Sequence, residues 1–231
     1  MTPASLLAGL VLTISLLAPV GHAHEAGHDA HGMHATASSW EGSVEGKAYS
    51  EFNHHVAGVF VLLIAASEAA TVSGRATLLW MRFLLPVAMT LAGLLLLIFS
   101  DHDAWPIGTM TLAQTLSGAD PEILQHKLYG ILLLIVGAIE SVRRSGRLGG
   151  FGWRVPLPLF AIVGGLMLLS HSHGAHPSAH KIALHHTVMG ALAISAGSGK
   201  LVANGLSRPR WELAWPLLIL IIGIQLLFYS E

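Results

Sequence analysis

The sequence predicts an all-α membrane protein, a polytopic bundle of transmembrane helices, and three observations support this. Hydrophobic residues make up 53% of the 231 positions and charged residues only 11%, whereas a soluble domain carries about 25% charged residues. Apolar segments follow one another along the chain, each close to the roughly 20 residues that cross a bilayer as a helix. Three of these segments open with His-x-x-x-Gly. Because backbone groups in lipid need internal hydrogen bonds, we expect these segments to be helices.

Six apolar segments follow the N-terminal region, and none has more than one charged group in its central part. They predict six transmembrane helices, at residues 54–72, 79–100, 123–142, 155–171, 182–203 and 213–229. The expected organisation is a signal peptide at residues 1–23, a histidine-rich periplasmic tail at 24–50 and a six-helix transmembrane domain at 51–231.

The N-terminal region has the pattern of a secretory signal followed by a metal-capturing tail. Residues 6–20 are apolar but short for a span, and residues 21–23 form a small-x-small cleavage pattern. No Lys or Arg precedes this stretch, which leaves an uncleaved signal anchor as the alternative. A histidine every three or four residues in the tail is typical of metal capture, with a plain solvated tail as the alternative. These tail histidines are His24, His28, His31 and His34.

The basic residues indicate how the helices are oriented. All arginines fall in the connections after the first, third and fifth predicted helices or at their edges. The opposite connections carry only Lys47, Lys127 and Lys181 as basic residues. The positive-inside rule therefore places the arginine-bearing connections in the cytoplasm. We expect a multi-pass protein of the bacterial inner membrane, with the mature N-terminus and the C-terminus in the periplasm.

The His-x-x-x-Gly motif marks an internal repeat. Its copies run from His54 to Gly58, from His126 to Gly130 and from His186 to Gly190. An ionisable residue follows each histidine at an offset of 14 positions, namely Glu68, Glu140 and Lys200. At about 100° and 1.5 Å per residue, this offset returns to the same helix face about 21 Å deeper. We therefore expect three helical-hairpin repeats, each with a histidine at one membrane face and a charge near the other.

The histidines beyond the tail are all expected on the periplasmic face. Ionisable groups inside a membrane are costly and usually face the bundle interior, so histidines in the first turns of three helices are expected to meet at one depth. Imidazole is the commonest metal ligand, and Cu(II) binds most tightly in the general affinity order. A shared metal or haem site is the hypothesis, and scattered interfacial histidines are the alternative. The predicted ligands are His54, His55, His126, His185 and His186, with His171 and His173.

Further polar side chains, the motif glycines and the methionines complete the predictions for the helices and their ends. Glu68, Glu140 and Lys200 are expected to form a structural ion pair, alone or with arginines such as Arg143, or else a proton or cation relay. A second candidate feature on the periplasmic side consists of Asp101, His102 and Asp103. Carboxylates beside a histidine can bind a metal or orient the histidine that binds it. The glycines of the motif are expected to allow close helix packing. The methionines inside the helices, including Met89, Met167 and Met189, are expected to serve packing.

Composition excludes several classes of protein. The chain has no cysteine, which excludes disulfides, thiolate metal sites, Fe–S clusters and c-type haem attachment. A net charge of −1 offers no electrostatic footprint for nucleic acid. No complete phosphate-binding glycine motif is present, and no catalytic residues are predicted. Its fifteen histidines point instead to metal held through imidazole, carboxylate or thioether.

The helical region, about residues 54–229, resembles the bacterial copper-resistance membrane proteins of the CopD type. The similarity rests on topology, on outward-facing histidines and on the His-rich leader. It implies copper binding, uptake or resistance, with His54, His55, His126, His185 and His186 at the site and a periplasmic copper chaperone as a partner. Many members of that family are longer than this chain, so the resemblance implies copper binding more directly than copper transport.

Two other functions remain as alternatives. The His-x-x-x-Gly helix starts would suit axial ligands of haem b, as in cytochromes similar to b561. In that case a single outer haem is expected, because the inner half offers no histidine. A nickel, cobalt or zinc permease would also suit the His-rich leader, but the intramembrane His/Asp motifs of such permeases are not evident.

Overall fold

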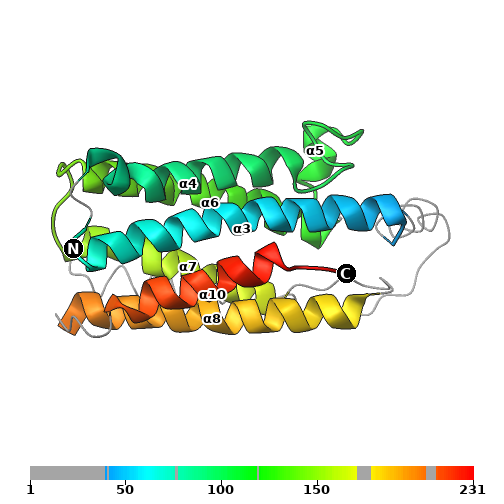
Figure 1. Ribbon diagram of the computed structural model, residues 1–231. Helices are drawn as coiled ribbons and strands as arrows, with labels where there is room; N and C mark the ends of the chain where they lie inside the picture. Colours follow the sequence, from blue (N-terminus) through cyan, green and yellow to red (C-terminus); the bar gives the residue numbers. More distant parts are fainter. Residues whose placement is uncertain (1–39, 41, 76–77, 119, 171–177, 207–211) are drawn as a thin grey trace, which may run out of the picture. The chain divides into compact units, whose positions relative to one another are not determined.

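The computed structural model describes residues 40, 42–75, 78–118, 120–170, 178–206 and 212–231, and all regular structure in them is helical (Figure 1). The predicted signal peptide, the tail histidines, His171 and His173 lie outside these residues. The helices are α3 (Val44–Val72), α4 (Leu79–Phe99), α5 (Leu112–Thr115), α6 (Pro121–Arg144), α7 (Pro156–Ser170), α8 (Ala179–Leu206) and α10 (Ala214–Leu227), with a 3-10 turn, η1, at Phe151–Arg154. The prediction of an all-α chain is confirmed for the described residues.

Local chemistry explains where the helix that carries His126 begins and ends. The Asp120 side chain accepts hydrogen bonds from the first free amides of α6, and Pro121 supplies a backbone already suited to the first turn. Arg143 and Arg144 in the last turn favourably face the negative end of the helix dipole. Gly146 follows with a φ of 81°, a left-handed conformation that glycine adopts without strain.

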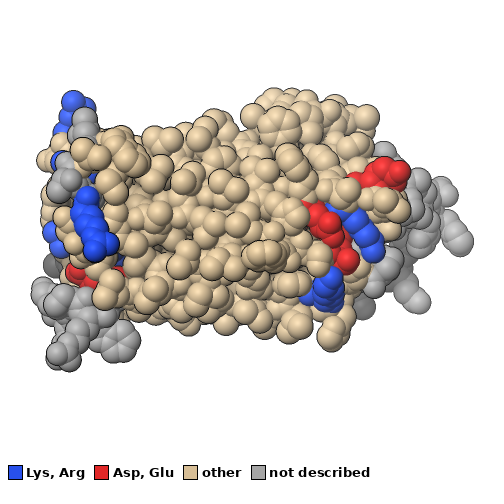
Figure 2. All heavy atoms as spheres, viewed as in Figure 1, with Lys and Arg blue, Asp and Glu red and all other residues tan. Residues whose placement is uncertain are grey.

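Within the described residues, four helical segments are long and apolar enough to cross a membrane: α3, Trp80–Phe99 in α4, α6, and the stretch Phe151–Ser170 that joins η1 to α7. A membrane-embedded protein is therefore supported. The fifth and sixth predicted spans coincide with α8 and α10, but α8 is not among these four segments and α10 has only 14 residues. Figure 2 is consistent with a membrane-embedded protein, since charged side chains gather at the two ends of the visible face and an uncharged belt lies between them.

The closest helix pairs differ from the predicted hairpins. α3 packs most extensively on α10, α4 on α6 and α7 on α8, whereas the pairs α3–α4, α6–α7 and α8–α10 pack less extensively. The motif glycines explain this choice. Gly58, Gly130 and Gly190 face α10, α4 and α7, and in each case a Cβ would lie within 3.1 Å of a backbone atom of that neighbour. Glycine thus lets three histidine-bearing helices approach three histidine-free helices closely.

Candidate functional site

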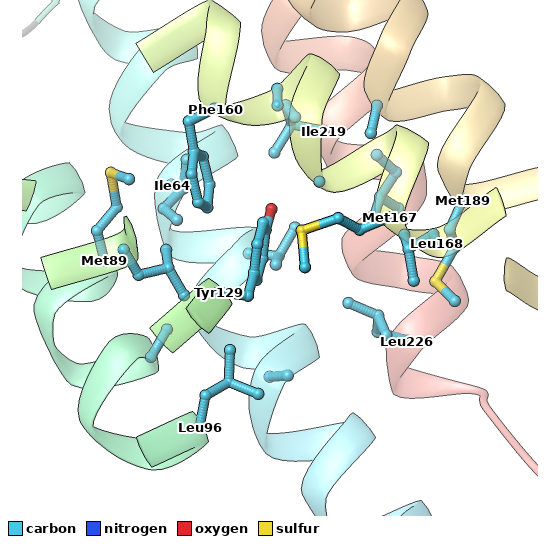
Figure 3. Close-up of a pocket in the computed structure, with 18 of the residues that line it drawn as sticks. Ile64, Met89, Leu96, Tyr129, Phe160, Met167, Leu168, Met189, Ile219 and Leu226 are labelled. Atoms are coloured by element: carbon cyan, nitrogen blue, oxygen red, sulfur yellow. The ribbon is translucent and has the colours of Figure 1, made fainter. Parts of the chain in front are cut away.

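A cavity of about 280 Å³ lies inside the helical bundle, lined by side chains from α3, α4, α6, α7, α8 and α10. We call it the central cavity. Its walls are mostly aliphatic and aromatic, with Tyr129 and Phe160 stacked at 4.6 Å between ring centroids (Figure 3). Gly164 makes room for this pair, because a Cβ there would come within 2.6 Å of the Tyr129 ring. The cavity is therefore built around a tyrosine from α6.

The first histidine of each motif copy lines this cavity. His54 from α3, His126 from α6 and His186 from α8 all contribute to its wall, although they are far apart in the sequence. The rings of His54 and His186 lie 6.2 Å apart, centroid to centroid, at 29° between their planes. His186 is buried, with 4% of its surface exposed. The structure thus brings the three motif histidines to one cavity, and we call this the histidine end.

The backbone fixes the orientation and tautomer of His54. Its Nδ1 donates a hydrogen bond to the Ser50 carbonyl at 2.8 Å, and a carbonyl can only accept. The proton therefore sits on Nδ1, and in the neutral ring the lone pair lies on Nε2. The ring also stacks on Tyr229, with centroids 3.8 Å apart. A metal-binding histidine commonly shows this pattern, in which the nitrogen that does not bind the metal donates to a carbonyl or carboxylate.

A carboxylate orients His126 in the same way. Its Nδ1 lies 2.8 Å from Asp101 Oδ1, and the buried Lys127 ammonium lies 3.2 Å from Asp101 Oδ2. Lys127 also donates to the Leu97 carbonyl at 3.0 Å, and the Ser100 hydroxyl donates to Asp101. Burial alone would raise the pKa of the Asp101 carboxyl, but the hydrogen bond and charge of His126, the Ser100 hydroxyl and the Lys127 ammonium together lower it.

In each doubled pair, the histidine outside the motif does not line the cavity. His55 Nε2 donates to the Tyr229 carbonyl at 2.9 Å, and His185 lies against Gln225, whose amide nitrogen is 3.3 Å from its Nδ1. Both residues were predicted ligands. Neighbouring helix positions differ by about 100°, so only one member of each pair can face the cavity.

The outer Asp-His-Asp feature is divided in the structure. Asp101 contacts His126 rather than the adjacent His102. His102 instead stacks on Trp40 at 4.2 Å between centroids, and Asp103 pairs with it at 2.9 Å between Nδ1 and Oδ1. This second pair is largely exposed and does not line the cavity.

Among the described residues, no three histidine or acidic side chains are arranged to hold a metal ion together. Among the motif histidines, the ring contacts show His54 and His186 close to each other. Two imidazoles on opposite sides of one ion, at about 2.0 Å per metal–nitrogen bond, place their ring centroids roughly 6 Å apart. The observed separation fits a two-imidazole site, with His126 elsewhere on the wall of the same cavity.

The predicted inner charges form a buried ion-pair network, which we call the charged end. Arg144 bridges two carboxylates: it pairs with Glu68 and, through Nε, with Glu140 Oε2 at 3.2 Å. Arg143 adds a contact of 2.6 Å to Glu140, and Lys200 one of 3.0 Å to Glu68. Glu68 and Glu140 are 2% and 0% exposed. The contacts are those of a structural clasp, and the relay stays a prediction.

Sequence reasoning missed the sulfur atoms of the site. Met89, Met167 and Met189 all line the central cavity, although their positions within apolar helices indicated packing alone. A usable signal was present on α8, where Met189 follows His186 by three residues and therefore lies on the same face. Tyr129 had a similar signal, since it follows His126 by three residues on α6.

Comparisons of this chain with protein-family models, with curated proteins and with solved structures find no match.

Proposed function

We propose that this protein is an integral membrane copper-handling protein that binds copper at the histidine end of its central cavity. One observation carries the proposal: the three motif histidines, on three separate helices, line a single cavity. Histidines scattered at a membrane interface would have no reason to converge in this way. Imidazole is a good copper ligand, and copper leads the divalent affinity order.

The hydrogen bonds around two of these histidines support a metal site. His54 donates from Nδ1 to a backbone carbonyl, and His126 Nδ1 faces the carboxylate of Asp101. Partners of this kind raise the basicity of a ligand and hold its ring in place before the metal arrives. Because the carbonyl fixes the His54 tautomer, Nε2 is the nitrogen that would bind the ion. The 6.2 Å separation of the His54 and His186 rings suits a shared ion.

In this proposal all six predicted segments cross the membrane as three related hairpin units, and the histidine end faces the periplasm. The arginine distribution supports that orientation. Arg143 and Arg144 lie at the charged end, 17 and 18 positions after His126 on the same helix. Copper would then be received on the periplasmic side, where the His-rich tail and a periplasmic chaperone would deliver it.

The size of the cavity favours an ion over haem b. Pockets that enclose drug-sized ligands measure about 300–1,000 Å³, and a haem is larger than most such ligands. The central cavity has about 280 Å³. A b-type cytochrome remains the second candidate, because a pair of histidines beside stacked aromatic rings is also a setting in which haem is held.

The test uses full-length protein in which His24, His28, His31 and His34 are replaced by alanine, so that the tail no longer contributes copper. This protein, purified in detergent and loaded with copper, should retain about one ion per chain. The double variant His54→Ala/His186→Ala should lose it. The matched control is His55→Ala/His185→Ala, which changes the adjacent residues and should retain the ion.

Copper retention in the His54/His186 variant equal to that of the control would contradict the proposal. An absorption spectrum of the protein as purified distinguishes the alternative. A strong Soret band with stoichiometric iron would replace copper by haem b as the bound group. Melting temperatures of both double variants, measured without metal, show whether copper loss merely reflects unfolding.

A further inference from the structure

Three methionine sulfurs share the central cavity with the three motif histidines. Met89 comes from α4, Met167 from α7 and Met189 from α8. Figure 3 shows Met167 reaching toward the Tyr129 ring, with Met189 also on the α7 and α8 side of the cavity and Met89 on the α4 side. Met89 and Met189 are almost fully buried, at 1% and 3% exposed. The question is which of these thioethers lie at the level of the histidines.

A backbone contact between Gly165 and Gly190 sets the level of Met167. Helix α7 ends at the histidine end, where α8 begins. Met167 lies two residues from this contact toward the histidine end, about 3 Å along α7, and His186 lies four residues from it in the same direction, about 6 Å along α8. Both side chains line the cavity.

Met189 belongs to the same level. It follows His186 by three residues on α8, so the two side chains share a helix face one turn apart. Helical side chains lean toward the N-terminus of their helix, which directs Met189 back toward the turn of His186. The backbone contact between Gly165 and Gly190 brings α7 against α8 close by. Met167 and Met189 thus flank the histidine level from adjacent helices.

We infer that Met167 and Met189 are thioether ligands of the copper site and that they make it selective for Cu(I). The inference rests on the proposed function and adds the oxidation state and the sulfur ligands. Thioether is a soft ligand that selects Cu(I), whereas imidazole alone also suits Zn and Cu(II). The walls around the site are mostly apolar, which suits an ion of single charge better than one of double charge.

Methionine also fills irregular gaps in cores, so the test must separate packing from ligation. Leucine is close in volume to methionine, so this replacement is usually well tolerated in a core. The full-length protein without tail histidines is titrated with Cu(I) under anaerobic conditions against a competing chelator. Met167→Leu/Met189→Leu should weaken Cu(I) binding by about tenfold or more, because even the loss of a group that only orients a metal ligand weakens binding on this scale. Met81→Leu, on α4 but outside the lining of the central cavity, is the matched control and should leave Cu(I) affinity unchanged.

X-ray absorption at the copper edge supplies a second readout. The parent protein and the Met81 control should show sulfur neighbours of copper, and the double variant should show only nitrogen or oxygen. Zn(II) affinity should be equal in all three proteins. Unchanged Cu(I) affinity together with absent sulfur neighbours in the parent protein would overturn the methionine ligands while leaving copper binding intact. No copper retained by the parent protein in either oxidation state would overturn the proposed function itself.

Discussion

The two ends of the bundle use ionisable residues in opposite ways. At the charged end both buried carboxylates contact cations: Glu68 contacts Arg144 and Lys200, and Glu140 contacts Arg143 and Arg144. At the histidine end, imidazole rings line an apolar cavity, and a backbone carbonyl and a carboxylate contact the Nδ1 atoms of two of them. The same three helices supply both ends, about 21 Å apart along each helix.

This difference separates stability from binding. Buried charges that neutralise one another have satisfied their strongest interactions, so they hold helices together and offer little to a ligand. An imidazole that is held through one ring nitrogen can bind an ion through the other. We therefore expect substitutions at the charged end to change stability most, and substitutions at the histidine end to change metal binding most.

The largest effect on stability is expected from Arg144→Ala. This change leaves Glu140 and Glu68 buried with one cation each, and it removes the Arg144 donor to the Arg82 carbonyl at 3.0 Å. Removing one partner of a buried ion pair typically costs about 3–5 kcal/mol. Thermal or denaturant unfolding in detergent, followed by circular dichroism, measures the loss.

Arg147→Ala is the control, because Arg147 is exposed just beyond the same helix. Its loss should change stability by less than about 0.5 kcal/mol. If the two variants unfold alike, the charged end is not a clasp, and the relay interpretation of Glu68, Glu140 and Lys200 gains support.

A smaller, pH-dependent effect is expected from Asp101→Asn. Asp101 contacts His126 and Lys127, and Glu122 is the other acidic group near His126. Hydrogen bonds to charged groups contribute about 1.5–3 kcal/mol, so the variant should lose about this much at neutral pH. Because the pKa of Asp101 is lowered in the folded protein, its contribution is complete above the unfolded value and is lost as pH falls through the folded value.

Unfolding of metal-free protein across a pH series measures this. The difference in unfolding free energy between parent and Asp101→Asn should shrink below about pH 4. Asp103→Asn is the control, since its pair with His102 is largely exposed, and an exposed pair contributes at most about 1 kcal/mol. A constant difference at all pH values would show that the variant acts through shape rather than charge.

Much of this architecture follows from periodicity in the sequence. Apolar length predicts the helices, and the spacing of His54, His126 and His186 from their glycines predicts that each histidine shares a face with a packing position. The convergence of these histidines on one cavity is therefore a consequence of pattern. The 14-residue offset likewise indicates that Glu68 and Lys200 lie at one depth, where the structure pairs them at 3.0 Å.

The sequence does not indicate which helices pack against each other. A glycine shows that a neighbour comes close, but not which one, so the predicted hairpins differ from the observed pairs α3–α10, α4–α6 and α7–α8. The cavity depends on that pairing. Met167 becomes a wall residue because α7 lies beside both α6 and α8, and His55 contacts the Tyr229 carbonyl just beyond the end of α10.

The smallest effects are expected between the two ends, from two glycines of α8. A Cβ at Gly190 would lie 2.8 Å from the Gly165 carbonyl oxygen, so Gly190→Ala must push α7 and α8 apart. Overpacking of this kind costs about 1–3 kcal/mol. A Cβ at Gly199, on the same helix, would meet nothing within 4 Å. Gly199→Ala should therefore raise stability, by about 0.5–1 kcal/mol, because glycine weakens a helix interior.

Unfolding of the two alanine variants, with copper retention measured alongside, sharpens the contrast between stability and binding. Gly190 lies one turn below His186, so separating α7 from α8 there should also weaken copper retention. Gly199→Ala should leave copper retention unchanged while it stabilises the fold. If Gly190→Ala is instead as stable as the parent, α7 and α8 do not meet at this glycine, and the level shared by Met167, Met189 and His186 is not the one described.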